Sequence, residues 1–318
     1  MPNRRICLYF SWSRPKEINI ELGILDNRYP TLFEFRRAIW PIYEWASDPA
    51  RYRQDVSGFL DHVILFDFQA FHDVIAAETG HAISIIQREG DKPPVMELDD
   101  ELLREVDTLI VISLDHFRTG QRASPGEVEA IKAFLSRESA CLIVCPHHDV
   151  GAVDELPARE IQHRHHGDTL VPSQQRIGGF AKSLLDELGF PIENRFGLNP
   201  GRTDDGSPGM LVHIEGEHGR PRILENVRTF NLHPHLPHFW IPLSHRGEVS
   251  VLAKQPINVG ATPHPFTQDG NSHFDAFLHI PPGGDRSGHI FVCDATLWSA
   301  AFGGKPSLQQ LWKNVARF

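Results

Sequence analysis

Short apolar runs recur through the first half of the chain, each bounded by polar or charged residues. Their length and their content of β-branched and aromatic side chains are typical of strands that are buried on both faces of a sheet. The predicted strands are residues 5–11, 62–68, 82–87, 107–113 and 140–146.

Amphipathic segments lie between these runs, and the clearest of them is residues 124–139. Ser124 stands at the N-cap position, Pro125 follows in the first turn, and Glu127 completes a capping box. Apolar residues then recur at helical spacing, which predicts one buried face. Further helices are predicted at residues 32–46, 98–106 and 177–190. Strands that alternate with helices in this way predict βαβ units and a mainly parallel sheet with helices on both faces.

The pattern changes in the second half of the chain, where apolar stretches and turn residues favour added antiparallel strands. The stretches are residues 222–233, 249–254, 275–281 and 288–298, followed by a last helix over residues 307–318. No repeat or low-complexity linker divides the sequence. We therefore predict that residues 1–318 form a single elaborated α/β domain.

Composition narrows the classes of function. The 318 residues carry 31 Lys and Arg against 41 Asp and Glu, a formal net charge of −10. This acidic balance, with no basic run, argues against a nucleic-acid partner. No apolar run approaches membrane-spanning length, and the apolar stretch near the N-terminus is too short for a signal peptide. We therefore expect a cytoplasmic protein with no membrane partner, and assembly into a homo-oligomer stays open.

Histidine is the residue whose abundance stands out, with 19 copies against three Met and four Tyr. It is the commonest metal ligand and titrates near neutral pH. Many of the copies fall in three clusters: "PHHD" at 146–149, "HRHHGD" in a predicted loop at 163–168, and "NLHPHLPH" at 231–238. The first cluster directly follows a predicted strand, at the sheet edge where parallel α/β folds bind their ligands.

We predict that these clusters converge on one divalent metal ion. The predicted ligands are four of the clustered histidines: His147, His165, His233 and His235. The last two share one face of an extended segment, because side chains alternate along it. Two adjacent histidines rarely both bind the same ion. We therefore assign His148 and the neighbouring Asp149 to substrate contact or proton transfer. Zinc suits such a set best, and iron or copper would suit the same ligands. The alternative is that these are hydrogen-bonded loop histidines.

The order of the elements also resembles a known superfamily. The matching features are the strand "DTLIVIS" (107–113), the capped helix, the strand "ACLIVCP" (140–146), and a C-terminal strand and helix that carry Asp294 and Asn314. This arrangement is similar to the class I glutamine amidotransferase-like superfamily. That group includes the trehalose-utilisation-like proteins and the amidotransferase-like domains found beside ABC-transporter and gliding components. The resemblance implies a flavodoxin-like fold.

In the amidotransferases of that superfamily, the strand after the capped helix ends in a nucleophilic cysteine within a Gly-x-Cys-x-Gly turn. The resemblance makes Cys145 a candidate nucleophile, although its context, "IVCPHHD", lacks the glycines of that turn. The alternative for Cys145 is a buried strand residue. On that alternative, Cys145→Ser keeps most of the activity.

The histidine clusters predict a metal-dependent enzyme that acts on a small-molecule substrate. A hydrolase is the simplest case, because a metal-bound water then serves as the nucleophile. An iron- or copper-dependent oxygenase or lyase is the alternative on the same ligands. A non-catalytic, amidotransferase-like binding module is the alternative from another class, which the missing glycine turn favours and the histidine clusters oppose.

Overall fold

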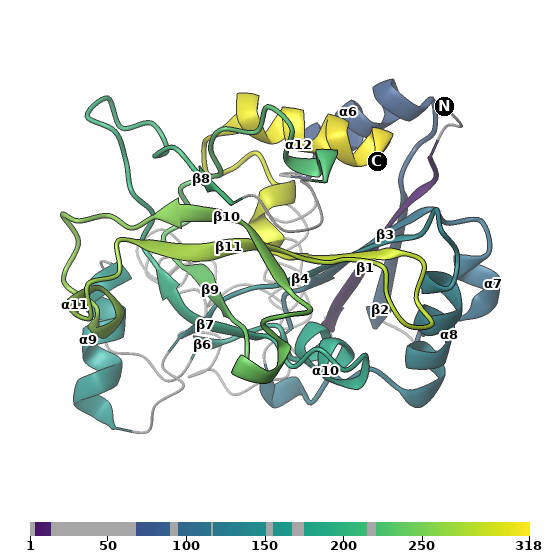
Figure 1. Ribbon diagram of the computed structural model, residues 1–318, viewed down its shortest axis with the longest axis horizontal. Helices are drawn as coiled ribbons and strands as arrows, with labels where there is room; N and C mark the ends of the chain where they lie inside the picture. Colours follow the sequence, from purple (N-terminus) through teal and green to yellow (C-terminus); the bar gives the residue numbers. More distant parts are fainter. Residues whose placement is uncertain are drawn as a thin grey trace, which may run out of the picture.

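The computed structural model describes residues 4–13, 68–89, 95–115, 117–150, 155–166, 175–214 and 221–318. Within these residues, the main sheet has the strand order β2-β1-β3-β4-β12-β11-β10-β8 (Figure 1). The first five strands of that order are parallel, and β11, β10 and β8 continue the sheet in antiparallel pairs. The strands are β1 Ile6–Ser13, β2 Ser84–Glu89, β3 Thr108–Ser113, β4 Cys141–Pro146, β8 Val212–His213, β10 Ser250–Pro256, β11 His273–Ile280 and β12 His289–Cys293.

The central strands are continuous apolar runs because both of their faces are covered. Strands β3 and β4 are buried along their whole length and are paired residue by residue. Alternate side chains enter opposite cores: Ile110 and Ile143 belong to one, and Leu109 and Leu142 belong to the other. A strand that is buried on both faces needs apolar residues at every position, and this explains why the sequence predicts these strands well.

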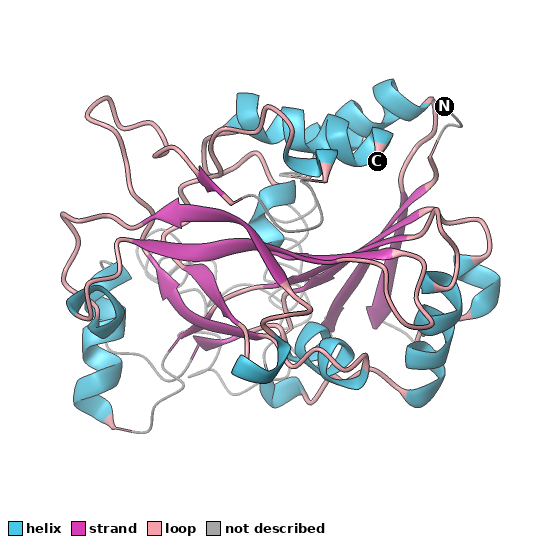
Figure 2. Ribbon diagram, viewed as in Figure 1, coloured by secondary structure: helices cyan, strands magenta, loops and turns pink. Residues whose placement is uncertain are grey.

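Helices lie on both faces of the main sheet (Figure 2). Helices α6 (Gln69–Thr79) and α12 (Lys305–Arg317) cover one face, where Phe71 and Trp312 pack with ring centroids 5.7 Å apart. The other core receives side chains from three helices: α7 (Asp100–Leu103), α8 (Pro125–Leu135) and α10 (Gly179–Glu187). The predicted α/β, flavodoxin-like fold is confirmed, including the antiparallel strands in the C-terminal half. Within the described ranges, no helix has the length and apolar content needed to cross a membrane.

The predicted capping box of α8 is also confirmed. Ser124 Oγ accepts a hydrogen bond from the Glu127 N–H across 3.2 Å, and the Glu127 carboxylate accepts one from the Ser124 N–H across 2.9 Å. The same buried carboxylate accepts two bonds of 3.0 Å from the Arg88 guanidinium and one of 2.8 Å from the Tyr9 hydroxyl. Glu127 therefore ties α8 to β1 and β2.

A second, smaller sheet begins where β4 ends. Its order within the described residues is β6-β5-β7-β9, and helix α9 contacts β5 and β7. Strand β4 ends at Pro146 and β5 begins at Asp149, so only His147 and His148 separate these two strands, which belong to different sheets. The elements of this part are β5 Asp149–Val150, α9 Leu156–His166, β6 Gln175–Arg176, β7 Glu193–Leu198, β9 Leu236–Trp240 and α11 Pro265–Gln268. Among the described residues, four 3-10 helices complete the elements: η2 Phe117–Thr119, η3 Arg222–Leu224, η4 Leu243–His245 and η5 Ala295–Trp298.

Four predictions from the sequence need correction or lie outside these residues. The predicted helix 32–46 and nearly all of the predicted strand 62–68 fall outside the described ranges, and Phe68 is the N-cap of α6. The predicted strand 222–233 is wrong, because beyond η3 the segment is irregular. Its backbone finds partners in distant segments instead of a ladder; the Thr229 N–H, for example, donates to Ser307 Oγ on α12 across 3.0 Å. The predicted loop at 163–168 is helical as far as residue 166, at the end of α9.

Candidate metal centre

The parallel pairing of β4 and β12 brings two functional side chains to one edge of the main sheet. Strand β4 is followed by His147 and β12 by Asp294, and the two strands are in register up to Val144 and Val292. His147 Nδ1 and Asp294 Oδ2 lie 2.8 Å apart, and both side chains are buried. The sheet itself therefore fixes this pair.

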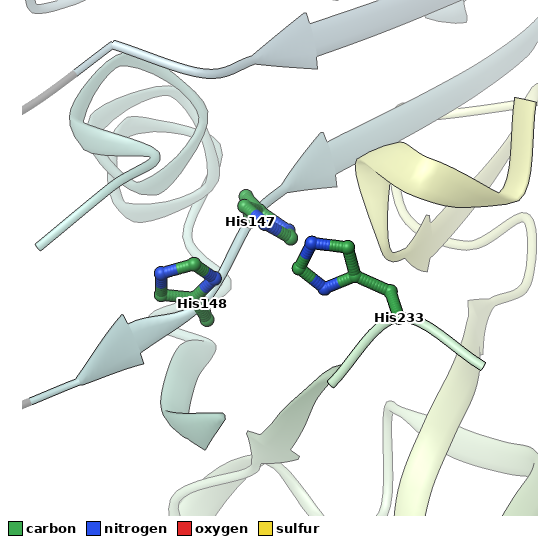
Figure 3. Close-up of side chains that lie close together, drawn as sticks. All are labelled: His147, His148 and His233. Atoms are coloured by element: carbon green, nitrogen blue, oxygen red, sulfur yellow. The ribbon is translucent and has the colours of Figure 1, made fainter. Parts of the chain in front are cut away.

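His233 reaches the same place from the irregular segment that precedes β9. One ligating atom from each of His147, His148 and His233 lies within 4.8 Å of the other two (Figure 3). The ring centroid of His147 lies 4.2 Å from that of His148 and 4.7 Å from that of His233. Over the part of the chain that the structure describes, these three form the one group of His, Cys, Asp or Glu side chains close enough to share an ion. The predicted meeting of the 147–149 and 233–235 segments is found.

The Asp294 carboxylate determines which nitrogen of His147 is available. Burial alone would raise the pKa of Asp294, but His147 and the hydrogen bonds to the carboxylate outweigh burial and hold that pKa below its ordinary value. An ionised carboxylate only accepts hydrogen bonds, so a neutral His147 carries its proton on Nδ1 and has a lone pair on Nε2. A carboxylate that holds the second nitrogen of a histidine in this way is the usual partner of a metal-binding imidazole.

His233 is oriented by the backbone of its own segment. The His235 N–H donates to His233 Nδ1 across 3.2 Å, so a neutral His233 ring carries its proton on Nε2. Figure 3 shows this ring turned toward His147. The His235 ring centroid lies 4.8 Å from that of His148 and 5.6 Å from that of His233. The predicted ligand His235 therefore lies beside the three-histidine group and outside the set that could share an ion.

Asp149, which the sequence assigned to proton transfer, forms an ion pair with Arg176. Arg176 Nε lies 2.9 Å from Asp149 Oδ1, and Nη2 lies 3.2 Å from Oδ2. Burial raises the pKa of Asp149, and the hydrogen bonds from Arg176 oppose this rise. The pair joins β5 to β6, and the Arg176 guanidinium lies over the ring of Phe117. Asp149 is thus next to His148 in sequence, but its carboxylate is engaged by the second sheet.

The structure places Cys145 in the core and not at the histidine group. Its thiol is fully buried, accepts a hydrogen bond of 3.1 Å from Trp298 Nε1, and lies 3.7 Å from the Cys293 sulfur. Without the glycines of a nucleophile turn, the strand continues straight into Pro146 and the side chain stays inward. This position fits the buried strand residue and does not fit the candidate nucleophile.

The structure also separates His165 from the predicted metal site. His165 lies on α9, where its Nδ1 donates to the Thr262 carbonyl across 2.7 Å. Its Nε2 accepts a hydrogen bond of 3.0 Å from the Asn199 N–H. Both nitrogens are engaged, and the ring packs against His264 with the centroids 5.5 Å apart. The prediction of His165 as a ligand is therefore corrected: this side chain fastens α9 to two neighbouring loops.

The neighbouring position at the same edge of the sheet, at the ends of β1 and β3, is filled by side chains of the protein itself. Asp115 is fully buried, and its carboxylate accepts hydrogen bonds from Ser11 Oγ (2.8 Å), Ser113 Oγ (2.6 Å) and the Phe180 N–H at the start of α10 (3.1 Å). In other doubly wound folds this position, between the strands where the order reverses, receives a ligand, often an anion at a helix N-terminus. Here the Asp115 carboxylate occupies that position. Among the described residues, the candidate functional side chains at this edge therefore follow β4 and β12.

Sequence reasoning missed two residues of this site. Asp294 was noted only as an acidic residue after a strand, through the resemblance, and its contact with His147 spans 147 positions of the chain. Thr296 was not considered, yet its N–H donates to Asp294 Oδ1 across 2.8 Å, and its hydroxyl donates to the same oxygen. The signal available was an Asp two residues before a Thr at the start of a 3-10 turn, a common local capping pattern.

Comparisons with known proteins add little to this geometry. No family model matches the chain, and no curated protein matches it significantly. A ThuA-like protein from Bacteroides uniformis ATCC 8492 is similar in structure over 98% of this chain and 91% of its own, with 9% sequence identity and a TM-score of 0.40. The mmIFT52 N-terminal domain is similar over 72% of this chain and 80% of its own, with 12% identity and a TM-score of 0.39. Similarities this low carry no conclusion about activity, and membership of the amidotransferase-like superfamily stays a prediction.

Proposed function

We propose that His147, His148 and His233 bind one divalent transition-metal ion, and that the chain is a metal-dependent enzyme acting on a small molecule, most simply by hydrolysis. The observations that carry this proposal are that one ring nitrogen from each of the three histidines lies within 4.8 Å of the other two, and that the buried Asp294 carboxylate holds His147 Nδ1.

The donor set favours particular metals. Three imidazoles suit zinc, copper, nickel or iron(II), whereas magnesium and calcium require oxygen ligands. Catalytic zinc typically has three protein ligands and keeps a fourth position for water. The set has no carboxylate ligand, since Asp294 is behind His147 and Asp149 is paired with Arg176. This disfavours the two-histidine, one-carboxylate pattern of iron oxygenases, so hydrolysis is the first choice and the oxygenase or lyase alternative the second.

Ion binding requires one adjustment in the site. His233 accepts the His235 N–H at Nδ1, so binding through Nε2 requires the proton of a neutral His233 to move to Nδ1. The hydrogen bond from His235 is then lost. We expect residues 233–235 to be the part of the site that shifts when the ion binds, whereas Asp294 already holds Nδ1 of His147.

The proposed chemistry follows from these positions. A zinc ion held by the three imidazoles would lower the pKa of a bound water to near 7 and would so supply hydroxide for attack at neutral pH. The His235 ring, 4.8 Å from that of His148, lies next to the group and is the side chain placed to move protons there. His148 becomes a ligand in this proposal, in place of the proton-transfer role expected from the sequence.

Cobalt(II) substitution tests the proposal. Tag-free protein titrated with cobalt should develop the visible absorption of a low-symmetry site with nitrogen ligands. The alanine variants of His147, His148 and His233 should each lose this absorption, while His165→Ala, which removes a buried histidine elsewhere, should keep it. A panel of chromogenic esters, amides and phosphoesters, assayed with and without a chelator, then tests for hydrolysis. Wild-type protein that shows no cobalt spectrum, or alanine variants that keep it, would refute the proposed centre and leave the binding-module alternative.

A further inference from the structure

The proposed ligands come from distant parts of the chain, and the structure shows what holds them at a fixed separation. His147 follows a strand of the main sheet, whereas His233 lies in an irregular segment with no ladder of its own. An irregular segment keeps a side chain in place only where its backbone groups are bonded to rigid neighbours. The segment that carries His233 is bonded to such neighbours through Asn231.

The Asn231 side chain uses its donors and its acceptor together. Its Nδ2 donates to the Thr296 carbonyl across 2.8 Å and to Thr296 Oγ1 across 2.9 Å. Its Oδ1 accepts the His233 N–H across 3.2 Å. Thr296 in turn donates from its N–H and its hydroxyl to Asp294, which holds His147. One continuous chain of hydrogen bonds therefore runs from the ring of His147 to the backbone of His233.

The three residues that link the two histidines are shielded from water. Asn231 is fully buried, Asp294 is 3% exposed and Thr296 is 9% exposed. The Asn231 carbonyl also accepts a hydrogen bond of 2.9 Å from the buried Gln255 on β10, which anchors the same residue to the main sheet. Buried hydrogen bonds have no competing solvent, so such a network fixes one arrangement of its members.

We infer that Asn231, acting through Thr296, is a positioning residue of the metal centre: it sets the distance between His147 and His233 before an ion binds. The inference rests on the proposed function. Asparagine is required at this position because the site needs two donors and one acceptor on a short side chain. An aspartate would face the Thr296 carbonyl with a second acceptor, and an alanine would remove the hydrogen bonds that Asn231 makes to the Thr296 carbonyl and the His233 N–H.

The test compares cobalt affinity and the visible cobalt spectrum across variants of the full chain. Asn231→Ala and Thr296→Val should weaken cobalt binding about 10- to 100-fold, as expected for residues that support a ligand from behind, and should change the shape of the spectrum. Thr296→Ser, which keeps the hydroxyl, should restore both. Asn314→Ala is the matched control, since Asn314 Nδ2 likewise bridges two backbone carbonyls, those of Ile223 and Glu225, away from the centre.

The outcomes separate this inference from the proposed function. Wild-type protein that binds no cobalt removes the metal centre and the inference with it. Wild-type protein that binds cobalt, with Asn231→Ala and Thr296→Val variants that bind it equally well and with the same spectrum, overturns the positioning role alone. If Asn231→Ala does not fold, the Thr296→Val and Thr296→Ser pair decides, because valine matches threonine in shape and removes only the hydroxyl that links Asn231 to Asp294.

Discussion

Replacing Asp294 by asparagine should reverse the proton arrangement of His147 without changing the shape of the site. The Oδ1 atom of Asp294 accepts two donors from Thr296, its N–H and its hydroxyl. An asparagine must therefore turn its carbonyl oxygen toward Thr296 and its amide group toward His147. The amide donates to Nδ1, so a neutral His147 would carry its proton on Nε2 and lose the lone pair there.

The size of the effect follows from the loss of one oriented ligand. Partners behind metal-binding histidines typically contribute 10- to 100-fold to affinity, so the Kd for zinc or cobalt should rise by about that factor, or about 1.4–2.8 kcal/mol. The loss should appear at neutral pH, where Asp294 is ionised because its pKa lies below its ordinary value. Overall folding should be retained, because the variant keeps the bonds to Thr296.

Two measurements check this prediction. Competition with a chromophoric chelator gives the Kd, and long-range proton–nitrogen NMR of the metal-free protein reports which nitrogen of His147 carries the proton. Asp275→Asn is the control, since Asp275 pairs with Lys254 at 3.1 Å on the surface of the antiparallel strands and should leave the Kd unchanged. An Asp294→Asn variant with wild-type affinity and with the His147 proton still on Nδ1 would show that Asp294 does not set the ligand nitrogen.

Three further predictions concern the rest of the molecule. Burial lowers the pKa of His238 from 6.5 to about 4, so the unfolded chain binds a proton that the folded chain excludes. The unfolding free energy should then fall as pH drops from about 6.5 to about 4, by up to about 3 kcal/mol, and urea melts of His238→Asn should show a flatter profile. Cys145→Ser should keep cobalt binding and any hydrolytic activity, because serine can still accept the Trp298 hydrogen bond; loss of turnover with a trapped adduct at Cys145 would contradict this. Glu127→Gln leaves the buried Arg88 guanidinium without the carboxylate that accepts two of its hydrogen bonds. Urea unfolding should show that the free energy of unfolding falls by about 3 kcal/mol. A fall below about 1 kcal/mol would count against the structural role of this pair.

The central fold could be predicted because its signals are local. The runs at 107–113 and 140–146 are apolar at every position, and only a strand covered on both faces requires that. The Ser124 capping box is contained within four residues of sequence. The position of the His147 and His148 pair also followed from local information, since a strand end in a parallel sheet lies at the ligand-binding edge.

The ligand set could be predicted only in part, because tertiary contacts complete it. The segment "HRHHGD" is polar on all sides and has no apolar stripe, so the helical position of His165 gives no periodic signal. The stretch 222–233 has strand-like composition, but distant side chains such as Ser307 bind its backbone. Asn231 and Thr296 look like ordinary turn residues in the sequence, and their link between His147 and His233 exists only in the folded chain.

The most direct test of the metal centre is the metal content of the protein as purified without a His tag. Elemental analysis should find about one first-row transition ion per chain in the wild type. A variant with His147, His148 and His233 all replaced by alanine should contain none, while His165→Ala should keep about one. Folded wild-type protein that binds no zinc, cobalt, copper or iron even after incubation with the free ions, or a triple variant with wild-type metal content, would contradict the account.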